Sequence, residues 1–256
     1  FGTFNTSSSE MIYPNIQSGS NQELTLGNST IYLNNTYNST LSEKWMLKSG
    51  LAWNYDHQNL KMDDDRIITN QKMVQAKIGF SYFLNEQTEL KMGADWMNFS
   101  YEQKIRMDGN YRLPFSNNEL SGFAEIEYKL SKKFATRLGS RAENSSLLNQ
   151  PTLVPRISGA YKTSDHSQIS LAAGEFYQNP ENDYLKFAPQ LQPEKASHLV
   201  TTWQYQTETK TFRIESYLKK YTKLVKYTAP LATNPLDYSN TGSGKASGVD
   251  LFWRDK

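Results

Sequence analysis

The densest run of charged side chains in the sequence is Asp-Asp-Asp-Arg, from Asp63 to Arg66. Adjacent carboxylates offer oxygen atoms of the kind that Ca²⁺ binds, but a calcium loop spaces its ligands apart and contains a glycine at its sharp turn. Neither feature is present here. A charge run more often lies in water. We therefore treat Asp63, Asp64, Asp65 and Arg66 as candidate ligand-binding residues of an external loop and expect no metal site.

Residues that could carry catalysis do not form a recognisable pattern. His57, His166 and His198 are far apart in the sequence, and the chain has no cysteine. Thiol nucleophiles, thiolate metal sites and disulfides are therefore excluded. The H-E-x-x-H, G-x-S-x-G and phosphate-loop motifs are also absent from the sequence. We expect that the chain is not an enzyme and has no cofactor.

Composition limits the class of partner. The net charge is only +2, with basic and acidic residues mixed along the chain, so there is no electrostatic case for nucleic acid. Hydrophobic residues make up 37% and aromatic residues 13% of the sequence. The sequence lacks an apolar run of about 18 residues, which excludes a helical membrane span but not a membrane β-strand, because such a strand is apolar on one face only.

Long stretches of the sequence alternate between apolar and polar side chains. In 44–58, for example, Trp45, Leu47 and Trp53 share one face. Side chains of a β-strand point alternately to its two faces, so each stretch predicts a strand between two different environments. We expect eleven strands ending near Trp253 and a possible twelfth in 1–13. These stretches exceed the five or six residues typical of strands in soluble proteins, which favours lipid against the apolar face.

The connections between these strands are expected to alternate between two kinds. Short polar turns are predicted near Ser42, Asn85, Ser131, Thr163 and Thr207. Longer connections are predicted at 59–70, 105–118, 144–153, 179–193 and 229–244. Outer-membrane barrels have this asymmetry, with short periplasmic turns and long external loops. The rhythm predicts an up-and-down antiparallel transmembrane β-barrel.

The second half of the chain carries five short motifs in order. They comprise Pro155, Arg156 and Tyr161; Gln178 and Pro180; Leu191, Pro193 and Glu194; Glu215 and Tyr217; and Asn240, Gly242, Gly248, Val249 and Asp250. Their order and spacing resemble the C-terminal barrel of TonB-dependent receptors. We expect the motif residues at strand ends to serve the fold, because glycine and proline there have structural uses. The resemblance covers residues 155–256 through motifs and the first half through rhythm alone.

The resemblance implies the rest of the protein. It implies a barrel of about 22 strands, of which residues 1–256 would form about half, with the plug domain and the remaining strands outside this chain. The implied function is uptake of a scarce small nutrient across the Gram-negative outer membrane, coupled to the TonB complex. Membrane lipid, the plug and TonB would be partners, and a surface lipoprotein is a further candidate.

Charged residues on the predicted lumen face are candidates to line a hydrated interior. They are Lys48, Lys77, Lys91, Glu125, Arg137, Arg141, Arg213, Glu215 and Lys219. Of these, Arg213 and Glu215 are our candidate ligand-binding residues. Two alternatives remain at this stage: a passive porin-like channel, and a soluble all-β adhesion or carbohydrate-binding module.

Overall fold

The computed structural model describes residues 1–14, 19, 21–107, 109–228 and 233–255. These residues form twelve strands: β1 (Gly2–Pro14), β2 (Asn21–Ser42), β3 (Trp45–Met62), β4 (Asp65–Asn85), β5 (Thr88–Arg106), β6 (Asn110–Lys129), β7 (Phe134–Ser145), β8 (Thr152–Lys162), β9 (Ser167–Gln178), β10 (Glu194–Gln206), β11 (Lys210–Tyr227) and β12 (Tyr238–Asp255). A short helix α1 (Asn182–Leu185) and a 3-10 helix η1 (Pro235–Asp237) lie in the connections.

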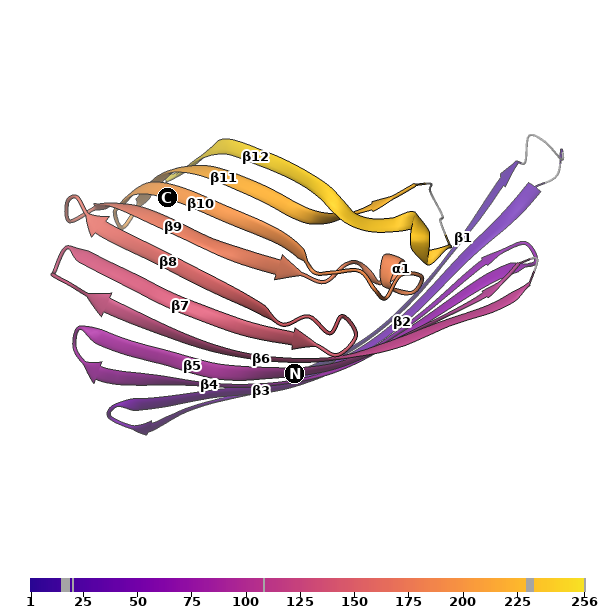
Figure 1. Ribbon diagram of the computed structural model, residues 1–256, viewed down its shortest axis with the longest axis horizontal. Helices are drawn as coiled ribbons and strands as arrows, with labels where there is room; N and C mark the ends of the chain where they lie inside the picture. The colour runs from indigo at the N-terminus through magenta and orange to yellow at the C-terminus, as the bar shows by residue number, and fades with distance from the viewer. Residues whose placement is uncertain (15–18, 20, 108, 229–232, 256) are drawn as a thin grey trace. The chain divides into compact units, whose positions relative to one another are not determined.

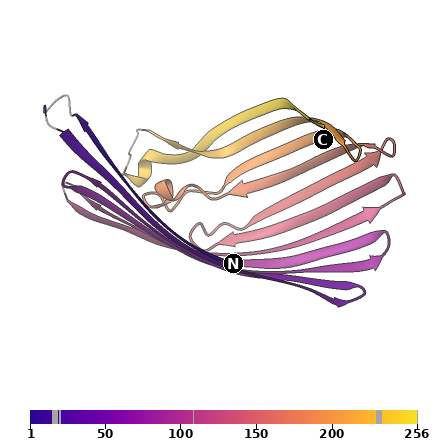
Figure 2. The same ribbon diagram turned by 180° about the vertical axis from the view of Figure 1, so that it is seen from behind.

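All twelve strands belong to one sheet, in which they follow the order of the sequence from β1 to β12 (Figure 1; Figure 2 shows the reverse side). Neighbouring strands pair antiparallel, for example β7 with β8 and β10 with β11. The all-β, up-and-down architecture and the number of strands are therefore as the alternation predicted. The described residues include no helix long and apolar enough to cross a membrane.

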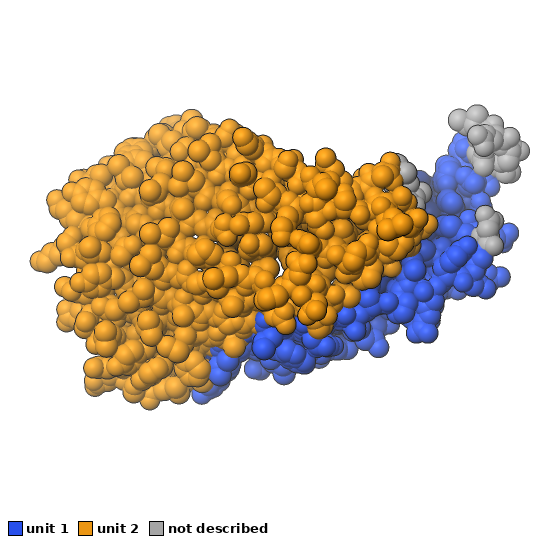
Figure 3. Space-filling view, in the orientation of Figure 1, with its two compact units in different colours: residues 1–38, 48–78, 95–120 blue, residues 39–47, 79–94, 121–256 orange. Residues whose placement is uncertain are grey.

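The chain divides into two compact units (Figure 3). The first consists of residues 1–38, 48–78 and 95–120, and the second of residues 39–47, 79–94 and 121–256. In the first unit, β1 pairs with β2 from Gly2 opposite Leu33 to Pro14 opposite Asn21. The aromatic rings of Tyr101 and Phe115 stack there with centroids 5.0 Å apart.

In the second unit, a row of apolar side chains crosses five strands in direct register. Leu138 lies opposite Ile157, which lies opposite Ala173. The row continues through Leu199 to Leu218. Four of these side chains are large, and they are 41 to 59% exposed. No second layer of the described residues covers them, so this row is a continuous apolar surface open to a surrounding solvent.

Aromatic side chains gather at the tight-turn end of the same unit. Trp203 and Phe212 meet edge to face, with centroids 5.8 Å apart. Trp45 packs on Tyr82 at 4.6 Å. Trp253, which lies opposite Phe212, is 73% exposed. Amphipathic rings at this level suit the boundary between hydrocarbon and headgroups.

Two of the predicted long connections are wrong. Strand β3 continues to Met62 and β4 begins at Asp65, so only Asp63 and Asp64 connect them. Likewise, β5 and β6 are separated by residues 107–109 alone, of which residue 108 lies outside the described part. The physical reason is that paired strands need only backbone hydrogen bonds beyond the lipid, so the ladder continues where apolar alternation stops.

The five short turns and the connections near 144–153 and 179–193 agree with the structure, whereas the connection predicted at 229–244 extends too far. The short turns occupy 43–44, 86–87, 130–133, 163–166 and 207–209. The longer ones occupy 146–151 and 179–193. In the connection predicted at 229–244, residues 229–232 lie outside the described part, and β12 already begins at Tyr238. Side chains of the 179–193 connection are well packed: Leu185 is 5%, Ala188 0% and Leu191 3% exposed. This connection is therefore a folded element.

Candidate functional site

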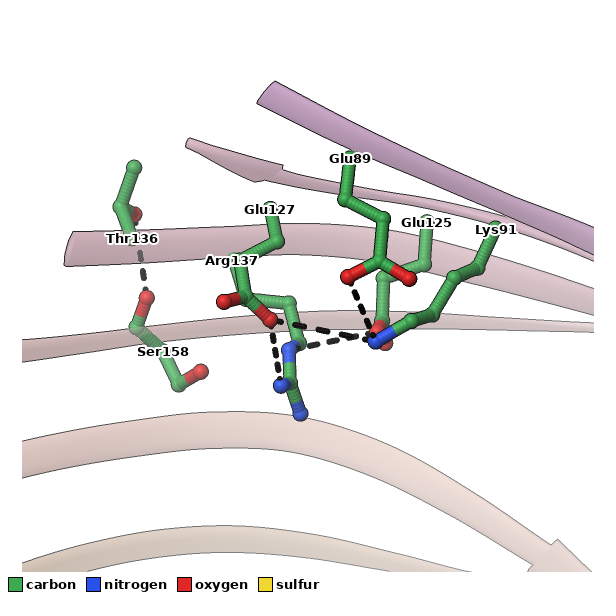
Figure 4. A network of polar contacts seen from close by, with 7 residues as sticks. All are labelled: Glu89, Lys91, Glu125, Glu127, Thr136, Arg137 and Ser158. Atoms are coloured by element: carbon green, nitrogen blue, oxygen red, sulfur yellow. Dashed lines mark hydrogen bonds and ion pairs between the residues drawn. The ribbon is translucent and has the colours of Figure 1, made fainter. Parts of the chain in front are cut away.

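The face opposite the apolar row carries a connected group of charged side chains on β5, β6 and β7 (Figure 4). Arg137 Nη2 donates to Glu127 Oε2 at 2.7 Å, and its Nε lies 3.2 Å from Glu125 Oε1. Lys91 Nζ lies 3.3 Å from Glu89 Oε2 and 3.9 Å from Glu127 Oε2. Two cations thus share three carboxylates across three adjacent strands.

The facing of this network follows from strand geometry. Arg137 lies opposite Ser158, whereas the next residue, Leu138, lies opposite Ile157 in the apolar row. Consecutive side chains point to opposite faces, so the network lies on the polar face. Its side chains are 22 to 48% exposed, and exposed ion pairs contribute about 0 to 1 kcal/mol each. The network therefore makes this face of the sheet hydrophilic and adds little to the stability of the fold.

A cavity of about 210 Å³ lies on the same polar face, between the network and β10. Its lining includes Arg137, Arg156, Phe176 and His198. A Cβ at Gly174 would be 2.9 Å from Arg156 Cγ. The arginine stem can lie across the strand only because Gly174 has no side chain.

His198 borders this cavity beside Phe176, with ring centroids 4.7 Å apart. Its Nε2 is buried and has no hydrogen-bond partner within the described residues. A buried polar atom without a partner is uncommon and marks a place where water or a ligand can bind. We expected Arg156 to serve the fold and did not single out His198. The structure brings both to one cavity, and their cross-strand proximity could not be read from local spacing.

The predicted ligand-binding residues fall in two separate places. Asp63 lies in the β3–β4 turn, where its Oδ1 accepts from the backbone N–H of Glu23 at 3.1 Å. Arg66 Nε donates to Asn59 Oδ1 at 2.7 Å. Both residues therefore belong to the hairpin structure, and Asp64 and Asp65 adjoin them at the tip. The described residues contain no group of three or more His, Asp or Glu arranged to hold a metal ion.

Arg213 and Glu215 occur together on the polar face of β11. Arg213 lies opposite Gln204 and Glu215 opposite Thr202. The Arg213 guanidinium lies 5.6 Å from the centre of the Phe252 ring, and Thr202 Oγ1 donates to Glu215 Oε2 at 3.3 Å. These two residues belong to the second unit, and Asp63 to Arg66 belong to the first.

The motif residues at 178–194 surround the 179–193 connection. Gln178 lies directly opposite Glu194 at the ends of β9 and β10. Pro180 and Pro193 are buried. Glu194 Oε1 accepts the backbone N–H of Val225 at 2.8 Å, next to a register irregularity in β11. These contacts hold the connection against β11.

Pro155 lies on β8, opposite Ser140 and next to Arg156.

Asn240 of β12 joins the 179–193 connection to β11 through its side-chain amide. Its Oδ1 accepts the Gln192 N–H at 2.8 Å, and its Nδ2 donates to Gln192 O at 3.0 Å and Lys223 O at 2.9 Å. Lys223 has φ 58°, a left-handed conformation within the β11 irregularity. A Cβ at Gly242 would lie 2.6 Å from Leu224 O. The Asn-x-Gly motif therefore fits the irregular pairing of β11 with β12.

A group of three tyrosines near the long connections was not predicted. Tyr184 of α1 lies 5.9 Å, between ring centroids, from both Tyr227 and Tyr238. Burial raises the pKa of the Tyr184 phenol, and the nearby Glu181 carboxylate adds to this. The sequence pattern around these three tyrosines does not distinguish them from aromatic residues at the membrane boundary.

The sequence matches a known family over nearly the whole chain. The family model "TonB dependent receptor-like, beta-barrel" matches residues 2–254. The chain belongs to the TonB-dependent receptor family. Receptors of this family are not enzymes, in keeping with the sequence expectation. No curated protein matches the chain in sequence.

Solved transporters and receptors share the fold. The FrpB iron transporter from Neisseria meningitidis aligns with TM-score 0.74 and 14% identity, over 100% of this chain and 46% of its own. The outer membrane transporter YddB from Escherichia coli gives 0.72 and 12%, over 98% and 42%. The Serratia marcescens hemophore receptor HasR, solved with HasA and heme, gives 0.72 and 9%, over 98% and 49%. The chain thus spans about half the length of these receptors.

Proposed function

We propose that this chain is the wall of an outer-membrane receptor that imports a scarce nutrient by TonB-coupled active transport. The observation that carries the proposal is the opposite character of the two sheet faces. One face presents the exposed row from Leu138 to Leu218, and the other presents the network around Arg137. Backbone groups in hydrocarbon must all be paired, so a sheet with these faces is stable in lipid as part of a closed barrel.

The polar face supplies the transport surface in this proposal. The Arg137 network, the cavity beside His198, and the pair Arg213 and Glu215 would line the hydrated interior. The interior would also contact a plug domain, and the apolar face would contact membrane lipid. The long connections would face outward, where cargo or a surface lipoprotein is met. The network's side chains are partly exposed, as a wetted wall requires.

An uptake assay tests the coupling. Cells that express the intact receptor are compared with cells that also lack TonB, using a panel of radiolabelled nutrients that includes iron and heme. We expect accumulation of one nutrient only when receptor and TonB are both present. Uptake that is equal without TonB would support a passive channel instead. Recovery of the receptor as a water-soluble monomer would support the soluble binding module.

A paired set of variants tests the facing. Arg137→Gln with Arg213→Gln removes two charges from the polar face. We expect slower uptake and unchanged insertion in the outer membrane, because polar substitutions on a wetted wall are tolerated. Arg141→Gln, a single change on the same face, serves as a milder comparison. Improved insertion with unchanged uptake would show that the faces are assigned the wrong way round, because removing a charge from a lipid-facing position is favourable.

A further inference from the structure

Two lysines face each other across β11 and β12 on the apolar side of the sheet. Lys220 lies directly opposite Lys245, and both are exposed. In the part of the chain that the structure describes, no acidic side chain is paired with either lysine. Like charges directly opposite each other across strands destabilise a sheet. An anion from outside the described residues would relieve this repulsion.

The side chains around the two lysines are short hydroxyls. Ser197 lies opposite Lys220 on β10, and Ser243 and Ser247 share the face of Lys245 because they are two residues away on β12. Thr222 shares the face of Lys220 because it is two residues away on β11. Hydroxyls and ammonium groups are both donors to anionic oxygen. This arrangement of two cations and four hydroxyls suits a phosphate group.

The position of the two lysines along the strands is as informative as their charge. On the tight-turn side lie Leu218, Val249 and Leu251, which are 59, 64 and 70% exposed. On the side of the long connections, Lys195 Nζ lies 2.7 Å from Glu175 Oε1 and 5.6 Å from the Tyr177 ring centre. From the tight turns towards the long connections, the surface is first apolar, then carries cations and hydroxyls, and then an ion pair beside an aromatic ring. A membrane boundary has this order.

We propose that Lys220 and Lys245, with the surrounding hydroxyls, bind the phosphate of an anionic lipid in the outer leaflet. The acyl chains of that lipid would cover Leu218, Val249 and Leu251. The inference rests on the membrane placement proposed above but concerns lipid rather than cargo. It also gives the cross-strand lysine pair a physical reason, because a phosphate between two ammonium groups converts repulsion into two attractions.

The same strand offers a matched control. Lys219 is adjacent to Lys220 in sequence but lies opposite His198, which lines the cavity of the polar face. Its Nζ lies 4.8 Å from the centre of the Tyr217 ring. Lys219→Gln therefore removes the same charge from the same strand while leaving the lipid-facing pair intact.

Lipid binding to the intact receptor tests the proposal. The receptor is purified from outer membranes in a zwitterionic detergent and titrated with bis-phosphorylated lipid A, its dephosphorylated form, or inorganic phosphate alone, with native mass spectrometry as the readout. We expect preference for the phosphorylated lipid. The Lys220→Gln, Lys245→Gln double variant should bind it about thirtyfold more weakly, from the usual contribution of two lysines at an anionic lipid surface. Lys219→Gln should bind it as the unmodified receptor does.

Several outcomes would overturn this inference. In the first, the double variant binds the phosphorylated lipid as tightly as the unmodified receptor does. In the second, the receptor binds the dephosphorylated lipid as tightly as the phosphorylated one. In the third, inorganic phosphate binds as tightly as the phosphorylated lipid. Membrane fractionation separates this failure from that of the proposed function. A receptor that reaches the outer membrane but shows no phosphate preference refutes the lipid site alone, whereas a receptor absent from that membrane refutes the placement itself.

Discussion

Gly248 lies beneath the phenol of Tyr217, so that a Cβ at position 248 would be 2.5 Å from Tyr217 Oη. The two residues are direct cross-strand partners on β11 and β12. A bulkier residue at 248 would have to displace the ring. At Gly242 the obstacle is backbone instead, because a Cβ there would meet Leu224 O at 2.6 Å. The same substitution should therefore have different effects at these two glycines.

We predict that Gly242→Ala destabilises the barrel more than Gly248→Ala. Overpacking costs about 1 to 3 kcal/mol, and a side chain such as Tyr217 can move aside more easily than the backbone at Leu224. Urea unfolding of the intact receptor in lipid, followed by tryptophan fluorescence, measures both. Tyr217→Ser should rescue Gly248→Ala and leave Gly242→Ala unchanged. Equal losses at both positions would contradict this ranking.

Replacement of Asn240 should loosen the 179–193 connection. Asn240→Ala removes three hydrogen bonds to part-buried or exposed backbone groups, and a typical hydrogen bond contributes about 0.5 to 1.5 kcal/mol. Asn240→Asp should be no better, because a carboxylate cannot donate to Gln192 O and Lys223 O. Limited proteolysis should show faster cleavage within 179–193 in both variants. The neighbouring Ser239→Ala, whose hydroxyl bonds Thr241 on the surface, should leave the cleavage rate unchanged.

Arginine scanning should distinguish the two faces of β10. Leu199 belongs to the apolar row, and the adjacent Val200 lines the cavity on the polar face. Arginine on a lipid-facing position near the midplane of a barrel costs about 2 to 4 kcal/mol, so Leu199→Arg should reduce folding into lipid vesicles. Val200→Arg should fold normally. The reverse result would mean that water, and not lipid, contacts the row of Leu199.

High pH should release α1. The raised pKa of Tyr184 means that its neutral phenol is favoured in the folded protein, relative to the ordinary value of 10.0. The stabilisation is present below that pH and is lost as pH rises towards the folded-state pKa. Protease sensitivity of 179–193 should increase above about pH 10. In Tyr184→Phe the increase should be smaller, whereas Tyr161→Phe, at the opposite end of the strands, should leave it unchanged.

Alternation predicted the strands well because the lipid-facing and water-facing requirements act on every second residue. Leu138 beside Arg137 is one example, since neither environment accepts the other side chain. The same rule predicts loops at 59–70 and 105–118, where apolar alternation stops and charged residues such as Asp65 occur, but the structure has strands there with only a short turn between them. Backbone pairing continues there without any side-chain signature.

The candidate site was less predictable because its residues meet across strands. Arg156, Gly174 and His198 lie in one cross-strand row, yet they are separated by 18 and 24 positions (174 − 156 and 198 − 174). Asn240 reaches Gln192 across 48 positions. Register must be known before such contacts can be inferred, and register depends on turn geometry as well as on pattern.

The turn at Asp63 couples two hairpins mechanically. Its N–H donates to Glu23 O and its Oδ1 accepts from Glu23 N–H, each at 3.1 Å, so both polar backbone atoms of Glu23 on β2 are held by one residue of the β3–β4 tip. A molecule that lands on this tip therefore pushes against two hairpins instead of one. We expect the two hairpins to move together as one unit. A spin label at Asp64 should therefore report slow motion shared by both hairpins.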